Sequence, residues 1–157
     1  MASRLAALSL SVCVATLFFV ADLASKHFLF VTPDSPNGFS FFNGWIESTQ
    51  FYNHGITFNI PVPTFLTLLI TLVALGWIVK RGMKGIDKAE GILLFVFLGI
   101  LTGGILGNAF DRLRFDYVRD WILIGHLSAL NIADCAIIIG AIGVLWRKPE
   151  DRYVTRK

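Results

Sequence analysis

Four long stretches of apolar residues divide this chain. The first three contain charge-free runs at residues 5–21, 62–79 and 91–110, and the fourth carries the polar pair Asn131 and Asp134. A helix of about 20 residues crosses the ~30 Å of hydrocarbon in a bilayer. The pattern therefore predicts one all-α membrane domain over residues 1–157, with four transmembrane helices. The predicted spans are residues 5–24, 62–80, 91–110 and 127–146.

The segment between the first two spans has a different pattern. Residues 32–38 are dense in turn formers, and aromatic and β-branched residues then flank Asn43-Gly44. Asn-Gly between such runs is a strong signal for a β-hairpin. We expect a small extracytoplasmic β-hairpin or sheet within residues 31–60. Because this segment is aromatic and has no Lys or Arg, we expect it to lie on the outer membrane interface.

Composition and charge support a membrane protein and give it an orientation. Of the 157 residues, 55% are hydrophobic and 16% are charged, against ~25% charged in soluble domains. Lys and Arg gather on the cytoplasmic side of membrane proteins, which places both termini in the cytoplasm here. One side holds Arg4, Lys80, Arg81, Lys84, Lys88, Arg147, Lys148, Arg152, Arg156 and Lys157, and the other holds Lys26, Arg112, Arg114 and Arg119.

The net charge of +3 fits attraction to anionic lipid headgroups. The basic residues flank the spans and form no stripe with interleaved aromatics, so we expect no nucleic-acid partner. The three histidines have no zinc-chelating spacing, and we expect no metal or cofactor.

The first apolar run could imitate a secretory signal peptide, because small residues follow it at positions 21–25. The run is longer than a typical signal core. Cleavage would also leave three spans and reverse the side of the basic C-terminal tail. We therefore expect the segment to be retained as a membrane helix.

Two carboxylates, Asp120 and Asp134, bracket a short and largely apolar stretch. An ionisable side chain beside so much hydrocarbon is usually functional. If a tight turn or a partly immersed loop brings them together, both cannot ionise comfortably, so one would hold a proton. Paired aspartates in that state can direct water at a carbonyl.

Other polar residues recur at helical spacing near the outer ends of the spans. Asp22 and Lys26 share one face, and spacing alone favours an ion pair that anchors the helix, with Lys26 reaching the headgroups, over a direct role. Arg112 needs an anionic partner, either Asp111 or a lipid phosphate. For Arg114 and Asp116 we favour a surface ion pair.

Asn131 lies three residues before Asp134, where its amide could hold a carboxylate or a substrate carbonyl. The sequence from Asn53 to Phe58 by itself indicates only a turn after a strand.

Together these pieces resemble the lipoprotein signal peptidases (signal peptidase II). Five motifs stand in the family's order across nearly the whole chain, although the interval from Asp120 to Asp134 is shorter than usual in that family. In chain order they are Asp22-Leu23-Ala24-Ser25-Lys26, Asn53-His54-Gly55-Ile56-Thr57-Phe58, Gly107-Asn108-Ala109-Phe110-Asp111-Arg112, Val118-Arg119-Asp120 and Asn131-Ile132-Ala133-Asp134.

The resemblance implies an intramembrane aspartyl endopeptidase of the bacterial cytoplasmic (inner) membrane, with its active site toward the extracytoplasmic side. It would remove the signal peptide of prolipoproteins, cutting before the diacylglyceryl-modified cysteine, with no cofactor or metal. Asp120 and Asp134 would be catalytic. The residues implied to bind substrate or support the site are Asp22, Lys26, Asn53, Gly55, Asn108, Asp111, Arg112 and Asn131.

A rival interpretation is a small proton-coupled transporter or channel, because intramembrane acids also form proton relays. It predicts carboxylates at staggered depths and polar residues on several spans. The third span is nearly all apolar and the candidate residues gather at one side, which favours the enzyme. A structural assembly factor is a third possibility, but it gives no reason for Asp134.

Overall fold

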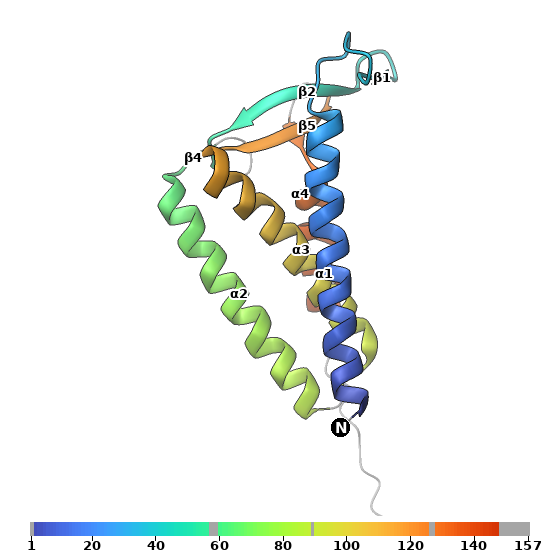
Figure 1. Ribbon diagram of the computed structural model, residues 1–157, viewed down its shortest axis with the longest axis vertical. Coiled ribbons are helices and arrows are strands. Elements are labelled where there is room, and N and C mark those ends of the chain that lie inside the picture. Colours follow the sequence, from blue (N-terminus) through green and yellow to red (C-terminus); the bar gives the residue numbers. More distant parts are fainter. Residues whose placement is uncertain (1, 57–59, 89, 126–127, 148–157) are drawn as a thin grey trace, which may run out of the picture.

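The computed structural model describes residues 2–56, 60–88, 90–125 and 128–147. Three helices are long and apolar enough to cross a membrane, and a fourth is apolar but shorter (Figure 1). They are α1 (Ala2–Leu29), α2 (Thr64–Asp87), α3 (Ile92–Phe115) and α4 (Ile132–Trp146). The helical part of the predicted architecture is therefore present.

Several boundaries differ from those predicted. α2 continues to Asp87, beyond the predicted end at residue 80, because no proline interrupts the charged residues that follow. α4 begins only at Ile132, whereas the predicted span began at residue 127. Residues 126 and 127, like the polar tail at 150–157, lie outside the described residues.

A four-stranded antiparallel sheet, in the order β1-β2-β5-β6, lies at one end of the helices (Figure 1). Its strands are β1 (Ser40–Phe41), β2 (Ile46–Asn53), β5 (Val118–Ile124) and β6 (Ser128–Leu130), and β3 (Gly55–Ile56) pairs separately with β4 (Ile60–Pro61). The predicted hairpin is confirmed, since Phe41 pairs with Ile46 and both Asn43 and Gly44 have positive φ angles, of 54° and 86°.

The prediction that the sheet is confined to the segment between the first two helices was wrong. β5 and β6 come from the segment between α3 and α4, so the fold is mixed α and β. Residues 118–124 include β-branched and aromatic side chains, which favour a strand, and Gly125 follows them with a φ of 55°. The antiparallel pairing of β5 with β6 returns the chain from Asp120 toward Asp134.

A β-bulge interrupts the pairing of β2 with β5. Ser48 pairs with Ile122, but the next pair joins Phe51 to Asp120, so β2 carries one extra residue opposite Trp121. Because side chains alternate along a strand, an extra residue changes the face to which the following ones point. The side chains in the second half of β2, which ends at Asn53, therefore point to the opposite face from the one that they would occupy without the bulge.

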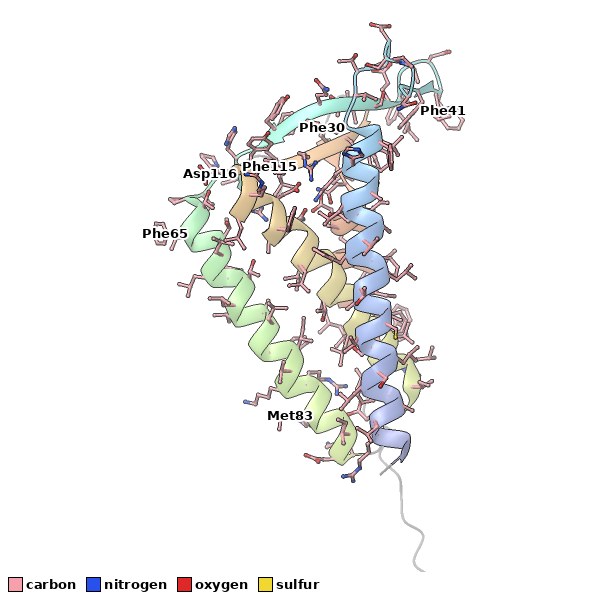
Figure 2. All side chains as sticks on the ribbon, in the orientation of Figure 1. Phe30, Phe41, Phe65, Met83, Phe115 and Asp116 are labelled. Atoms are coloured by element: carbon pink, nitrogen blue, oxygen red, sulfur yellow. The ribbon has the colours of Figure 1, made fainter. Side chains whose placement is uncertain are left out.

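Glycines let α3 pack closely against two neighbours. A Cβ at Gly103 would lie 2.6 Å from the Ala15 carbonyl oxygen of α1, and one at Gly104 would lie 2.5 Å from the Ala133 carbonyl oxygen of α4. α2 leans away from the others, and Figure 2 shows Phe65 projecting from its outer side, where it is 68% exposed. The apolar outer surface is what a lipid environment requires of a membrane helix.

The direction of the helices separates the basic residues from the sheet. The start of α1, the end of α2 and the start of α3 lie at the end opposite to the sheet (Figure 1), and Arg147, at the end of α4, contacts Gly91 beside the start of α3. The described basic residues of that end are Arg4, Lys80, Arg81, Lys84, Lys88 and Arg147. The structure thus places these basic residues, on which the predicted orientation depends, together at one end of the molecule.

Candidate functional site

Asp120 and Asp134 meet at one residue, Asn131. The Asn131 side-chain amide donates to Asp120 Oδ1, and its backbone N–H donates to Asp134 Oδ2 at 3.3 Å. Asp120 lies on β5 and Asp134 in the first turn of α4. The β5–β6 hairpin and the start of α4 therefore bring the two carboxylates to a common site.

Asn131 holds this position because it is also the N-cap of α4. Its Oδ1 accepts the backbone N–H of Asp134 at 3.0 Å, and Asp134 accepts the N–H of Asn131 in return. Reciprocal bonds of this kind form a capping box and satisfy free donors at the start of a helix. The cap fixes Asp134 and leaves the amide nitrogen of Asn131 free to face Asp120.

Asn108 of α3 connects this pair to the interior. Its amide nitrogen donates to Asp134 Oδ1 at 2.8 Å, and its Oδ1 accepts bonds from Asn131 at 3.2 Å and from Lys26 at 3.0 Å. The predicted site residues Asn108 and Asn131 therefore contact each other as well as the acids. The amide groups supply hydrogen-bond donors to the buried or partly buried carboxylates.

Asp120 is completely buried, at 0% exposure. Asn53 lies in the half of β2 that follows the bulge, and its side-chain amide donates to Asp120 Oδ2 at 3.0 Å. Burial and the nearby charge of Asp134 raise the pKa of Asp120 to about 7, against the opposing effect of the hydrogen bonds from Asn53 and Asn131. At neutral pH Asp120 is thus poised to carry a proton.

Lys26 is buried rather than extended to the headgroups, which corrects the favoured interpretation of this residue. It is 1% exposed, and its Nζ lies 2.7 Å from Asp22 Oδ2 and 3.2 Å from Asp111 Oδ2. Asp22 Oδ1 accepts the backbone N–H of Ala133 at 2.9 Å, so it also ties α1 to the start of α4. A buried charge needs such partners because desolvation is costly.

Of the two anionic partners considered for Arg112, Asp111 is not the one that it binds in the structure. Asp111 binds Arg119, whose Nη2 lies 2.8 Å from its Oδ1 and whose backbone N–H donates at 3.0 Å. Arg112 instead donates to the carbonyl oxygen of Gly55 at 3.0 Å. The strand that follows α3 brings Arg119 back over Asp111, which spacing within the helix could not reveal.

The expected ion pair of Arg114 and Asp116 does not form among the described residues. Asp116 ends α3 in a left-handed conformation, with φ 66°. The Arg114 guanidinium lies 5.6 Å from the centre of the Phe115 ring. The turn of the chain at Asp116 takes it off the helical face of Arg114.

A cavity of about 350 Å³ adjoins the acids, between α2, α3, α4 and the strands. Its polar lining comes from Asp134, Asn108, Arg112 and Asn53, together with the hydroxyl residues Thr67, Thr71 and Ser128. The remaining lining side chains are mainly aliphatic and include Ile56, Ile70, Ala74, Ile105, Leu130, Ile137 and Ile138. An apolar cavity with a few convergent polar groups is the usual form of a ligand site.

The backbone of Gly55 binds two of the residues that line this cavity. Its N–H donates to Asn53 Oδ1 at 3.0 Å, and its carbonyl oxygen holds Arg112. Thr57 and Phe58, which complete the motif that begins at Asn53, lie outside the described residues.

The structure adds residues that the sequence analysis did not assign to the site. The indole N–H of Trp121 donates to Ser25 Oγ at 3.1 Å, and Ser25 Oγ donates to the Asp22 carbonyl oxygen at 2.8 Å. Thr67 and Thr71 of α2 line the cavity. A strand assignment for residues 118–124 would have revealed Trp121, but nothing in the sequence distinguishes these threonines.

Among the described residues, no group of three or more His, Cys, Asp and Glu side chains is placed to hold a metal ion. The described side chains that line the cavity offer one carboxylate, amides, hydroxyls and one guanidinium, and Asp120 supplies a second carboxylate beside them. Two carboxyl groups, one of them with a pKa near neutrality, can act as acid and base.

The sequence profile described as signal peptidase (SPase) II matches residues 14–148 of the chain. This chain belongs to the signal peptidase II family. The matched region includes every candidate residue from Asp22 to Asp134. Signal peptidases are proteases, and the three membrane-length helices of the chain agree with that assignment.

Individual relatives carry the same designation. A lipoprotein signal peptidase of Shewanella baltica is 34% identical over 149 residues, covering 85% of this chain and 81% of the relative. One from Halothermothrix orenii is 33% identical over 106 residues, with coverages of 65% and 71%. One from Dehalococcoides mccartyi is 30% identical over 110 residues, and the alignment spans 66% of each protein, about two thirds of that relative.

Two solved structures of a bacterial membrane enzyme, both determined by the in meso method, share the fold. Their TM-scores are 0.74 and 0.71, at 23% and 24% identity. Each covers 87% of this chain, and the chain covers 85% and 90% of theirs. The mixed arrangement of helices and a terminal sheet is therefore a known architecture of membrane enzymes.

Proposed function

We propose that this chain is an aspartyl endopeptidase that removes the signal peptide of prolipoproteins, cutting before the cysteine that carries a diacylglyceryl group. Membership of the signal peptidase II family and relatives named lipoprotein signal peptidase support the substrate class. The observation that carries the mechanism is the attachment of Asp120 and Asp134 to the same residue, Asn131, beside an apolar cavity.

In this mechanism the two aspartates share one proton and activate water between them. The ionised carboxylate acts as general base for the attack on the scissile carbonyl. The protonated carboxyl polarises that carbonyl and later donates its proton to the leaving amine. The pKa of about 7 for Asp120 supports a dyad with a single proton at neutral pH.

Substrate must reach both acids for this to occur. Asp134 lines the cavity, whereas both oxygens of Asp120 are covered by amide groups of Asn53 and Asn131. We therefore propose that substrate backbone exchanges with these amide contacts. Asn53, Arg112 and Asn131 would then position the substrate, and the sheet at β1 and β2 would cradle it.

The buried charges behind the dyad would support it from a distance. Lys26 holds Asp22 and Asp111 and donates to Asn108. Its positive charge favours the ionised form of Asp120. None of Asp22, Lys26 and Asp111 lines the cavity among the described residues, so we assign them a structural and electrostatic role.

We assign the chain to the bacterial cytoplasmic membrane, with both termini in the cytoplasm and the site toward the extracytoplasmic side. The concentration of Lys and Arg at the end opposite to the sheet supports this orientation. The candidate acids gather beside the sheet and are not staggered along the helices, which favours a peptidase over a proton relay.

The deciding experiment compares Asp120→Asn and Asp134→Asn in a single-turnover assay with a diacylglyceryl-modified prolipoprotein. Each variant should lose at least ~10²-fold in rate, because each step needs both carboxyls. Asp116→Asn is a matched control, since Asp116 is exposed and Asn tolerates its left-handed conformation. Near-normal turnover by either dyad variant, with insertion in the membrane verified, would reject the mechanism.

A further inference from the structure

A second cavity, of about 370 Å³, lies between α3 and α4 near the end opposite to the sheet. It shares no lining residue with the cavity at the aspartates. Its lining consists of Phe97, Ile139, Ile142, Gly143, Trp146 and Arg147, so five of its six residues carry no charge. We refer to it as the basal groove.

The floor of the basal groove depends on Gly143. A Cβ at this position would collide with the ring of Phe97, so the absence of a side chain lets that ring lie directly on α4. Ile139 and Ile142 stand 51% and 56% exposed beside it, and Trp146 is 83% exposed at the helix end. This is a surface that water would wet poorly and that an acyl chain would cover well.

Arg147 lies at one end of the lining of the basal groove, and its positive charge has no acidic partner among the described residues. Its hydrogen bond to the Gly91 carbonyl oxygen is long, at 3.5 Å. Glu90, the acid next to Gly91, is held by Arg81 at 2.7 and 3.1 Å. The first turn of α3 contains no acidic residue either. The guanidinium is therefore available to an external anion.

We propose that the basal groove binds one anionic phospholipid. The acyl chain lies on Phe97, Ile139 and Ile142, and the Arg147 fork binds the phosphate in two places. Trp146, next to it, suits the headgroup level, where aromatic residues concentrate. Basic pockets at the ends of membrane helices recognise lipid headgroups in this way.

The charges of this end of the molecule favour a lipid over a protein partner. Lys80, Lys84 and Lys88 lie at the same end and, together with Arg147, attract an anionic surface. The groove lies between α3, which is long and apolar enough to cross a membrane, and the shorter apolar helix α4, so a lipid chain could reach it. The proposal does not depend on peptidase activity.

The test is native mass spectrometry of the full chain in detergent, with equal amounts of dioleoyl-phosphatidylglycerol and dioleoyl-phosphatidylcholine. We expect the wild type to retain one phosphatidylglycerol preferentially. Arg147→Gln should lower that preference about fivefold, the factor that corresponds to ~1 kcal/mol for one basic residue near an anionic headgroup. Ile142→Trp should fill the groove and reduce retention of both lipids.

Lys84→Gln is the matched control, because it removes the same charge from an exposed position of the same end outside the groove. It should keep the preference of the wild type. Equal retention of the two lipids by the wild type would overturn the proposal. So would an equal loss in Lys84→Gln and Arg147→Gln, since that would indicate general charge attraction. Lipid retention and precursor cleavage are separate readouts, so each proposal can fail alone.

Discussion

Asn131 shows how one residue can serve structure and chemistry together. As N-cap it fixes the first turn of α4, and its remaining amide nitrogen faces Asp120 and Asn108. From the sequence, the Asn131 amide could hold either a carboxylate or a substrate carbonyl, and the structure shows a carboxylate. The sequence could not predict that the carboxylate would be Asp120, since that contact depends on the hairpin that precedes α4.

At the same scale, Arg112 and Arg114 differ in a way that substitution can measure. Arg112 lines the cavity and donates to the Gly55 carbonyl oxygen, whereas Arg114 is exposed. A lysine keeps the charge but loses the planar fork. We expect Arg112→Lys to reduce kcat/KM at least ~10-fold, or ~1.4 kcal/mol in transition-state binding. Arg114→Lys should stay within about twofold.

Steady-state cleavage by the two lysine variants, at equal amounts of folded protein, checks this prediction. Equal losses at both positions would remove the case for a role of Arg112 at the substrate.

The proton on Asp120 gives a second prediction for a single residue. A carboxyl with a pKa of about 7 holds its proton below that pH, so activity of a singly protonated dyad should fall as the pH rises through 7. The Asn53 amide stabilises the charged form, and its removal must raise the pKa further. In Asn53→Ala the basic limb of the pH–rate profile should therefore move to higher pH. A limb that stays in place or moves downward would contradict the assignment.

At the scale of elements, the helices were predicted well and the strands only in part. The long apolar runs predicted where the helices lie, and Asn43-Gly44 predicted the turn between β1 and β2. β5 and β6 were not predicted, because the stretch between the two aspartates is as apolar as a membrane segment. Their partner β2 lies about 70 residues earlier in the chain, and pairing over that distance leaves no local pattern.

The same hairpin explains why two charge assignments failed. Arg119 reaches Asp111 only because β5 turns back over the end of α3. Lys26 is buried only because α3 and α4 bring Asn108 and the Asp22–Ala133 bond around it. Helical spacing identifies residues that share a face, but the element that covers the face comes from elsewhere in the chain.

Trp121 joins β5 to α1, and this contact can be tested as a latch between elements. Its indole N–H donates to Ser25, opposite the bulge and one residue after Asp120. Trp121→Phe keeps a large ring but removes the donor, which should destabilise the fold by about 1 kcal/mol. If the latch positions Asp120, turnover should also fall severalfold while KM changes little.

Ser25→Ala removes the other partner of the same bond. The double variant should then lose little more than either single variant, in both unfolding temperature and turnover. Fully additive losses would mean that the two residues act independently and that the latch does not hold the strand.

At the scale of the whole molecule, the helix lengths place the site close to one membrane surface. Arg147, at the end of α4, contacts Gly91 at the start of α3, so these two ends lie at one level. From Ile92 to Asn108, which binds Asp134, α3 rises about 24 Å. In ~30 Å of hydrocarbon the aspartates would then lie a few ångströms inside the opposite boundary, beneath the sheet.

That depth suits a substrate whose modified cysteine sits at the interface while its acyl chains remain in the bilayer. Partitioning can then bring the scissile bond to the aspartates, at ~0.8 kcal/mol per buried methylene. An unlipidated precursor lacks this anchor and leaves the aliphatic part of the cavity unfilled. We expect it to be cleaved at least ~100-fold less efficiently, a difference of about 2.7 kcal/mol. Lipidated and unlipidated forms of one precursor should be compared side by side in nanodiscs, with Asp134→Asn as the blank. Comparable rates for the two forms would indicate an intramembrane peptidase that does not select for the lipid.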